Sequence, residues 1–463
     1  MRFPAEIFRS YDIRGTTDQL SEDLAFAVGR AVVAKTRAKT VVVGSDMRGT
    51  SPAFARAVAK GAVAAGAEVV DIGECTTPMF NFAVLHTDSQ LPTPNSQTAG
   101  VMVTASHNPA EYNGFKVTRG DAMPISGEEI RETIEASEAR RHAGKPEGLR
   151  AYEPSTSSVT HLDVSGPYLE RLFALAQMPR LDGMKVAVDA GNGMAGVILP
   201  KLFDRLDAKL TALYFDPDGT FPNHEANPIK TETLKDLVRA VKKQKAAVGV
   251  AFDGDADRVG FVDEQGDPIG GDQMLALLAA LRLKEHPEGV VIWSPNASWA
   301  VRDAIRDNGG RGLWEKVGRT NIIKRVQSEG AILGGEVSAH YFYPEFGGME
   351  SSEFTMLLVL KAIAESGKPL SALIAPFRAY ARSPETNFEV YDKEKALAAL
   401  EATYAPGAAA VERLDGARYE YADWWFNVRK SNTEPLIRVN AEAASPELLS
   451  AKMREIAEII KKT

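Results

Sequence analysis

The sequence predicts an α/β protein with three related α/β domains, whose sheets are mixed and largely parallel, and a smaller C-terminal α+β domain around a central cleft. Two observations lead to this prediction. Three segments repeat a pattern of strand, polar turn, amphipathic helix and strand, and the remainder from about Ser371 lacks it. The 463 residues also exceed one domain, because about 150 residues per domain is usual. Short apolar strands that alternate with helices indicate parallel pairing.

The three repeated segments start at Lys39, Met184 and Gly289. Each is followed by a further apolar strand, near Val101, Val248 and Ala331, that runs into a polar loop. The third unit is shorter than the other two, so the repeat is degenerate. Ligands in open α/β sheets bind at the carboxyl ends of strands. The three loops therefore predict one shared cleft.

The C-terminal remainder contains two strand-like segments, NFEVYD and PLIRVNAEA, and an amphipathic helix, PELLSAKMREIAEIIKK. Linkers are expected at 143–160, near 263–271 and at 366–370. The predicted domains are 1–157, 158–262, 263–370 and 371–463, and each contributes one of the loops described below.

Composition narrows the classes of function. The net charge of −8 argues against a general nucleic-acid binder, which would carry a basic excess. No apolar run approaches the ~20 residues that span a bilayer, so no membrane partner is expected. The N-terminus has no secretory pattern, and Cys75 is the single cysteine, so we expect a cytoplasmic protein without disulfides. Cys75 has no His or Cys close to it in the sequence and is expected to be a packing residue.

The loop DGDADR places carboxylates at Asp253, Asp255 and Asp257. In an extended segment this spacing points all three to one side. Such a cluster needs a cation, and oxygen ligands suit Mg²⁺ or Ca²⁺. A solvated acidic turn is the simpler alternative. An EF-hand is rejected, although Glu264 falls at its twelfth position, because Arg258 replaces the required glycine and the flanks resemble strands.

The loop TASHNP offers Ser106 and His107. Adjacent residues rarely face each other, so His107 is a poor base for Ser106, and no G-x-S-x-G elbow supports a serine hydrolase. Phosphorylation of Ser106 beside a metal fits better, although a turn role is the default for such a loop. Lys116 follows in YNGFK. In a cleft beside Arg14 and Arg258, its pKa could fall from ~10.4 and make it a base.

Two later loops carry groups that suit a sugar phosphate. GGEVSAH offers Glu336 and Ser338 for vicinal hydroxyls, while a glycine-rich turn with an exposed acid is equally plausible. RKSNTEP, from Arg429, is followed by Arg438 and could cradle a phosphate through charge-assisted hydrogen bonds. By itself this loop could equally be a solvated hairpin.

Taken in order, these motifs resemble the α-D-phosphohexomutase family. The resemblance covers all four predicted domains through TASHNP with YNGFK, DGDADR, GEVSAH and RKSNTEP, and the opening FRSYDIRG matches too. GEVSAH is most similar to the GEMSGH of the bacterial phosphomannomutase/phosphoglucomutase group, whereas phosphoglucosamine mutases carry GEQSGH. The family has three related α/β domains and a smaller fourth around a deep cleft.

The resemblance implies a role for each motif. Ser106 would be the phosphoserine, with Lys116 as the favoured general base and His340 as a second acid/base candidate. Mg²⁺ would be held by Ser106, Asp253, Asp255 and Asp257. The transferring phosphate would be surrounded by Tyr11, Arg14, Lys116, Arg258 and His340. Sugar hydroxyls would contact Glu336 and Ser338. The non-reacting phosphate would be held by Arg429, Ser431, Asn432, Thr433 and Arg438.

The resemblance also implies an activity: reversible phosphoryl transfer between the 1- and 6-positions of mannose and glucose phosphates. Hexose 1,6-bisphosphate would be the intermediate and activator. Small hexose phosphates would then be the partners. Two departures affect the third domain, because Arg319 stands where many members have a histidine and Asn296 where a lysine is common. The alternatives are a phosphoglucosamine mutase and a non-catalytic sugar-phosphate binding protein.

Overall fold

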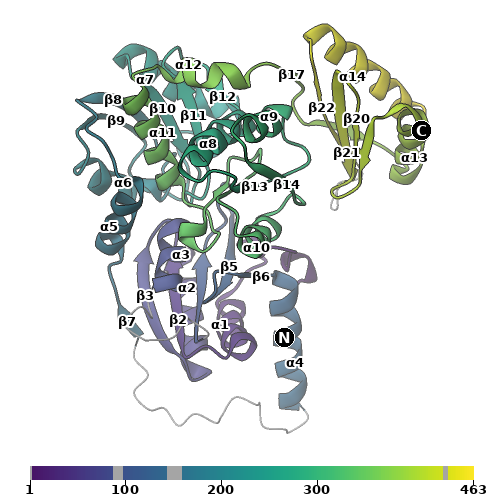
Figure 1. Ribbon diagram of the computed structural model, residues 1–463. Helices are drawn as coiled ribbons and strands as arrows, with labels where there is room; N and C mark the ends of the chain where they lie inside the picture. Colours follow the sequence, from purple (N-terminus) through teal and green to yellow (C-terminus); the bar gives the residue numbers. More distant parts are fainter. Residues whose placement is uncertain (1–2, 87–96, 143–158, 431–435) are drawn as a thin grey trace. The chain divides into compact units, whose positions relative to one another are not determined.

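The computed structural model of the protein describes residues 3–86, 97–142, 159–430 and 436–463. Its strands form four sheets (Figure 1). The chain divides into two compact units. The first unit joins Met1–Ile269 to Ala339–Leu370, and the second joins Gly270–Ser338 to Ser371–Thr463. Among the described residues, no helix combines the length and the apolar character that crossing a membrane requires.

The first sheet has the strand order β1-β5-β4-β2-β3-β7, with β6 beside β5. Its strands are β1 (Ile13–Thr16), β2 (Thr40–Ser45), β3 (Glu68–Glu74), β4 (Thr98–Val103), β5 (Tyr112–Arg119), β6 (Pro124–Ile125) and β7 (Val159–His161). Its helices are η1 (Ala5–Ile7), α1 (Glu22–Thr36), α2 (Ser51–Ala64), α3 (Thr77–His86) and α4 (Gly127–His142). Strand β2 pairs in parallel with β3 and β4, while β5 runs antiparallel to β4 and β1.

Both faces of this sheet are covered, which explains the uninterrupted apolar strands. Val41 and Val101 belong to the core cluster formed with α1 and α2. On the other face, a side chain at Gly100 would collide with Phe80 and Val84 of α3. The adjacent Cys75 is fully buried, and this burial raises the pKa of its thiol, as expected for a packing residue.

The second sheet has the order β12-β11-β10-β8-β9. Its strands are β8 (Met184–Asp189), β9 (Ala208–Leu213), β10 (Val248–Phe252), β11 (Val259–Asp263) and β12 (Pro268–Ile269). The helices of this region are α5 (Ser165–Ala176), α6 (Ala195–Phe203), η2 (Thr231–Leu234) and α7 (Lys235–Gln244). The first unit also contains β16 (Tyr341–Phe342), η3 (Pro344–Phe346) and α11 (Ser352–Ser366). Helix α11 contacts α5 and β11.

The third sheet contains β14 (Arg311–Trp314), β13 (Val290–Trp293) and β15 (Leu333–Gly335), in that order. Its helices are α8 (Gly271–Glu285), α9 (Trp299–Asp307) and α10 (Arg319–Glu329). Ser298 caps the start of α9, because its side chain accepts a hydrogen bond from the Ala300 backbone N–H.

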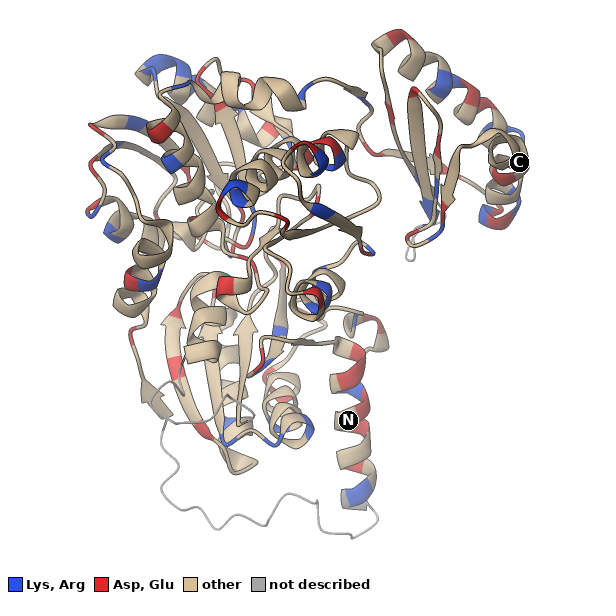
Figure 2. Ribbon diagram, in the orientation of Figure 1, with Lys and Arg blue, Asp and Glu red and all other residues tan. Residues whose placement is uncertain are grey.

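The fourth sheet has the order β17-β22-β21-β20-β19, with β18 also paired to β22. Its strands are β17 (Ala381–Arg382), β18 (Thr386–Glu389), β19 (Ala410–Glu412), β20 (Ala417–Glu420), β21 (Trp424–Lys430) and β22 (Leu436–Ala443). The helices α13 (Lys393–Tyr404), η5 (Ala405–Gly407) and α14 (Pro446–Lys461) accompany this sheet. Before it in the chain come α12 (Leu370–Ile374) and η4 (Ala375–Phe377), and η4 contacts α8 and α9. Acidic and basic residues are interspersed along α14, as they are along α4 (Figure 2).

The first three sheets repeat one arrangement. In each, the opening strand (β2, β8 or β13) lies between two parallel neighbours. One neighbour follows the helix (β3, β9 or β14), and the other is the later strand (β4, β10 or β15). This confirms the predicted repeat of mixed α/β sheets with a smaller α+β region after it. The loops after β2, β3 and β4 start at the same edge of the first sheet, because parallel strands end together.

Candidate active site

Ser106 lies three residues after β4, in a loop that the surrounding structure holds in an unusual conformation. Its φ is +53°, in the left-handed region, which costs a non-glycine residue of order 1–3 kcal/mol unless its neighbours hold it there. The Ser106 backbone N–H donates to Thr104 Oγ1 at 2.9 Å. The side chain is buried. Ser106 is therefore presented at one fixed position rather than on a mobile tip.

The carboxylate loop differs from its prediction in one respect. Residues 253–258 form a tight turn, not an extended segment, since the Ala256 N–H donates to the Asp253 carbonyl at 3.1 Å and Ala256 has a φ of +57°. The three aspartates converge all the same, because the turn folds them inward. The flanking segments are the antiparallel strands β10 and β11, which confirms that this is not an EF-hand.

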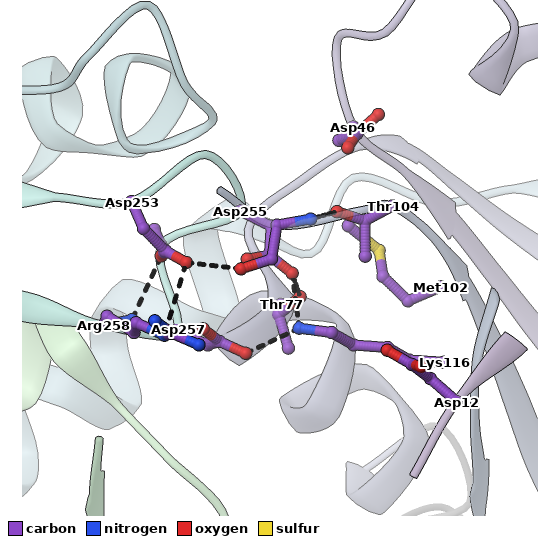
Figure 3. A network of polar contacts seen from close by, with 12 residues as sticks. Asp12, Asp46, Thr77, Met102, Thr104, Lys116, Asp253, Asp255, Asp257 and Arg258 are labelled. Atoms are coloured by element: carbon purple, nitrogen blue, oxygen red, sulfur yellow. Dashed lines mark hydrogen bonds and ion pairs between the residues drawn. The ribbon is translucent and has the colours of Figure 1, made fainter. Parts of the chain in front are cut away.

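A hydrogen bond joins the two loops. Ser106 Oγ donates to Asp253 Oδ2 at 2.6 Å. Asp253, Asp255 and Asp257 each place a carboxylate oxygen within 4.8 Å of the others, and all three residues are buried. The ammonium of Lys116, from β5, lies 2.6 Å from both Asp255 Oδ2 and Asp257 Oδ2 (Figure 3). These ion pairs favour the charged form of Lys116.

The crowded carboxylates perturb one another. Burial and the charges of Asp257 and Asp255 raise the pKa of Asp253 to about 8. Burial acts in the same direction on Asp257, but the positive charges beside it, that of Lys116 above all, hold the pKa of Asp257 well below its usual range. Three ionised carboxylates this close together are unfavourable without a cation among them.

The acidic cluster fits a divalent cation. Asp255 Oδ1 is buried and accepts no hydrogen bond from the described residues, and Asp257 Oδ1 likewise accepts none, lying 3.4 Å from His340 Nε2. Buried carboxylate oxygens of this kind need a partner. Together with Asp253 and the Ser106 hydroxyl they form an all-oxygen donor set, which Mg²⁺ prefers. The predicted ligands are thus brought together.

Cations and imidazoles surround this cluster. Arg258 Nε donates to His340 Nε2 at 3.2 Å, so this nitrogen carries a lone pair. Arg14, on β1, donates to Asn108 Oδ1 at 2.7 Å and thereby contacts the Ser106 loop. Tyr11 lies just before β1 and is 44% exposed.

The expectation that His107 would not face Ser106 is wrong. His107 Nδ1 lies 3.1 Å from Ser106 Oγ, because the left-handed backbone at Ser106 turns the two side chains to the same side. Burial, reinforced by the charges of Arg258 and Arg14, lowers the pKa of His107 to about 2. The imidazole is therefore neutral at physiological pH.

The second compact unit holds the predicted sugar-binding group. Glu336 directly follows β15 and is buried, with Oε1 accepting the Gly318 backbone N–H at 2.6 Å. Ser338 Oγ donates to Glu336 Oε2 at 3.4 Å. Arg319 opens α10, next to Gly318. The structure therefore brings Arg319 into the same neighbourhood as Glu336 and Ser338.

The two arginines predicted to hold the non-reacting phosphate, here called the phosphate clamp, bind a carboxylate in the structure. Arg429 on β21 and Arg438 on β22 are cross-strand partners. Arg429 Nη2 donates to Glu385 Oε2 at 2.7 Å, and Arg438 Nη1 donates to Glu385 Oε1 at 3.3 Å. The two arginines thus share one carboxylate. The predicted Ser431, Asn432 and Thr433 lie outside the described residues.

Several residues at this edge of the first sheet were not predicted from the sequence as part of the site. Asp46 and Arg48 follow β2, and Thr77 follows β3. Thr77 Oγ1 donates to Asp255 Oδ2 at 2.6 Å. A usable signal was present, because all three follow strands that run parallel to β4 in the same sheet.

Family models match nearly the whole chain. The phosphoglucomutase/phosphomannomutase α/β/α domains I, II and III match residues 5–142, 167–266 and 270–380, and the C-terminal domain of the same family matches 385–459. The chain is 36% identical over 468 residues to "Phosphohexose mutases" of Xanthomonas campestris pv. campestris, covering 100% of both. It is 36% identical to a phosphomannomutase of Salmonella montevideo, covering 98% of both.

A solved structure agrees. The crystal structure of a phosphoglucomutase/phosphomannomutase family protein from Burkholderia thailandensis has a TM-score of 0.87 and 32% identity, covering 100% of this chain and 98% of that one. Fold, site and relatives together define a hexose phosphate mutase, an isomerase that moves a phosphoryl group within a sugar. The chain belongs to the phosphoglucomutase/phosphomannomutase family, whose members are generally Mg²⁺-dependent.

Proposed function

We propose that the protein interconverts the 1- and 6-phosphates of mannose and glucose through a phosphoserine at Ser106 and a hexose 1,6-bisphosphate intermediate. The hydrogen bond from Ser106 Oγ to Asp253 Oδ2 at 2.6 Å carries this proposal. This hydrogen bond links two groups. One is the hydroxyl that the resemblance assigns as the nucleophile, and the other is a buried turn that carries three carboxylates. A sugar-binding protein without turnover needs no such pairing.

In the proposed reaction, the P–O bond to Ser106 Oγ breaks as a new P–O bond forms to the free hydroxyl of the sugar monophosphate. The proton of that hydroxyl passes to a base, and Ser106 Oγ ends protonated. The bisphosphate then returns its other phosphoryl group to Ser106 and leaves as the isomer. No phosphoryl group is gained or lost over the cycle.

We assign the base to Lys116, with His340 as a second candidate. Lys116 lies within 2.6 Å of two carboxylates, which retain its proton in the state described here, so it accepts a proton only after these contacts weaken. His340 Nε2 already has a lone pair, directed at Arg258 Nε. Arg14, Arg258 and Tyr11 would surround the transferring phosphate.

Ser106, Asp253, Asp255 and Asp257 would hold Mg²⁺. The ion supplies positive charge that offsets the negative charge of the phosphoryl oxygens. The carboxylates supply the oxygen donors and Thr77 fixes one of them.

We assign the rest of the substrate to the second unit. Glu336 and Ser338 would contact sugar hydroxyls, with Arg319 beside them. Arg429, Arg438 and residues 431–433 would hold the non-reacting phosphate. The four loops would belong to four domains with boundaries at 1–157, 158–262, 263–370 and 371–463.

Mutase assays on glucose 1-phosphate, mannose 1-phosphate and glucosamine 1-phosphate, run side by side, test this function. Val337 has no polar group for the 2-substituent, so we expect both neutral hexoses to react with specificity constants within about a hundredfold of each other. Faster turnover of the amino sugar would instead indicate a phosphoglucosamine mutase. A protein that carries phosphate on Ser106 but converts none of the three would be a binding protein.

A further inference from the structure

Arg48 is a fully buried cation outside the set of residues assigned to the reaction. Its exposed fraction is 1%, and it lies in the loop that follows β2. Its Nε donates to Asp46 Oδ2 at 3.1 Å, and Asp46 also accepts the Arg48 backbone N–H and the Ser51 hydroxyl. Asp46 is itself fully buried, so the carboxylate fixes the plane of the guanidinium.

The other four guanidinium N–H groups all point at one loop. Nη2 donates to the carbonyls of Ser106 at 2.8 Å and Asn108 at 2.6 Å. Nη1 donates to the carbonyls of Pro109 at 2.7 Å and Tyr112 at 2.8 Å. Every donor of Arg48 is used, and four of the five hold the backbone between Ser106 and Tyr112. A lysine has one ammonium and cannot span four carbonyls in this way.

The carbonyl of Ser106 is confined from a second side by the carboxylate turn. A Cβ added to Gly254 would lie 2.4 Å from this oxygen, so the two backbones are in close contact. Phe221 completes the enclosure. The centroid of its ring lies 5.1 Å from Arg48 Cζ, and its Cζ atom lies 3.5 Å from the position of the added Gly254 Cβ. The Ser106 backbone is therefore held between Arg48 and the turn that carries Asp253.

We propose that Arg48 is a positioning residue for phosphoryl transfer. It holds Ser106 in its left-handed conformation and so sets where Ser106 Oγ lies relative to Asp253. It does not touch the reacting atoms. This inference rests on the proposed role of Ser106. A displacement of about 1 Å between reacting groups can cost on the order of 10²-fold in rate.

The test compares Arg48→Lys and Arg48→Ala with the native protein in kcat, KM and phosphate occupancy of Ser106 after incubation with glucose 1,6-bisphosphate. We expect kcat to fall about 10- to 100-fold with KM within about twofold, and added guanidinium to restore part of the kcat of Arg48→Ala but not of Arg48→Lys. Arg418→Lys is the matched control. Arg418 is equally buried, and it also donates to carbonyls, those of Pro295 and Ala297, but it lies on β20 in the other unit.

A purely structural role would give lower thermal stability with kcat per folded molecule unchanged, as is expected for Arg418→Lys, and would overturn the inference. If Arg48→Ala does not fold, Asp46→Asn takes its place, because it removes the carboxylate that orients the guanidinium and should lower kcat in the same way. Native protein that takes up no phosphate on Ser106 would refute the proposed function itself. Native uptake together with unaltered kinetics in the Arg48 variants would refute only the role of Arg48.

Discussion

Thr77 contacts Asp255 through both its side chain and its backbone. Thr77 Oγ1 donates to Asp255 Oδ2 at 2.6 Å, and the Thr77 N–H donates to the Asp255 carbonyl at 2.8 Å. Thr77 is the first residue of α3, so the start of this helix is fixed to the carboxylate turn. The contact occupies one oxygen of Asp255 and leaves Oδ1, which accepts no hydrogen bond from the described residues, for a cation.

Removing the Thr77 hydroxyl should weaken the binding of Mg²⁺. Groups that orient metal ligands typically contribute 10- to 100-fold, so Thr77→Val should raise the Mg²⁺ concentration for half-maximal activity about tenfold. A magnesium titration of the initial rate measures this. Thr118→Val is the control, because Thr118 is as buried but its hydroxyl has no partner among the described residues. Equal magnesium requirements for the two variants would contradict the assignment.

Magnesium should also stabilise the folded protein. A ligand that binds the native state at about 100 times its Kd adds about 2.7 kcal/mol. Adding Mg²⁺ to the chelator-treated protein should therefore raise Tm, whereas Asp255→Asn should show a smaller rise. Differential scanning fluorimetry over a magnesium series measures both. A native Tm that does not respond to Mg²⁺ would mean that the three aspartates do not hold the ion.

Much of this arrangement is predictable from the sequence, and the reason is the repeat. Strand alternation and spacing place a loop after each later strand, and in two of the three repeats that loop carries Ser106 or Asp253. The meeting of these two loops does not follow from strand pairing, because β4 and β10 belong to different sheets. The family resemblance supplied the roles, since a Ser-His-Asn loop alone is typical of an ordinary turn.

The remaining features depend on tertiary contacts that leave little trace in sequence patterns. The turn at 253–258 and the contact between Ser106 and His107 both depend on left-handed backbones at non-glycine residues, Ala256 and Ser106, which propensity does not predict. Glu385 lies far along the chain from Arg429 and Arg438, and only the antiparallel register of the fourth sheet brings the three together.

Glu385 should compete with substrate for its two arginines. Its carboxylate lies 2.7 Å from Arg429 and 3.3 Å from Arg438, in the position that a phosphate would take in the proposed clamp. Glu385→Gln should therefore lower KM for glucose 1-phosphate several-fold, while Arg429→Ala should raise KM and lower kcat together. Steady-state kinetics on both variants measure this. Changes in the same direction would show that Glu385 supports the clamp rather than occupying it.

A histidine in the second sheet region should make stability depend on pH. A hydrogen bond with Asp189 at 3.0 Å raises the pKa of His224, whose ring also packs edge-on against Tyr214. A raised folded-state pKa stabilises the protein below the ordinary value of about 6.5, and this stability is lost as the pH rises through the folded-state pKa.

His224→Gln should therefore lower Tm by about 2–4 °C near pH 5.5 and by clearly less near pH 8.5. Thermal unfolding at both pH values measures the difference, with the exposed His286→Gln as the control. A loss of Tm that is the same at both pH values would mean that the Asp189 contact contributes through packing and not through charge.

The most direct test of the account is to locate the phosphoryl group during turnover. The native protein, incubated with glucose 1,6-bisphosphate and mapped by peptide mass spectrometry, should carry one phosphate, on Ser106, and should lose it when glucose 1-phosphate is added as bisphosphate forms. Ser106→Ala should take up no phosphate there, and its kcat should fall at least about 10³-fold. Phosphate on a different residue, or a Ser106→Ala variant with near-native kcat, would contradict the account.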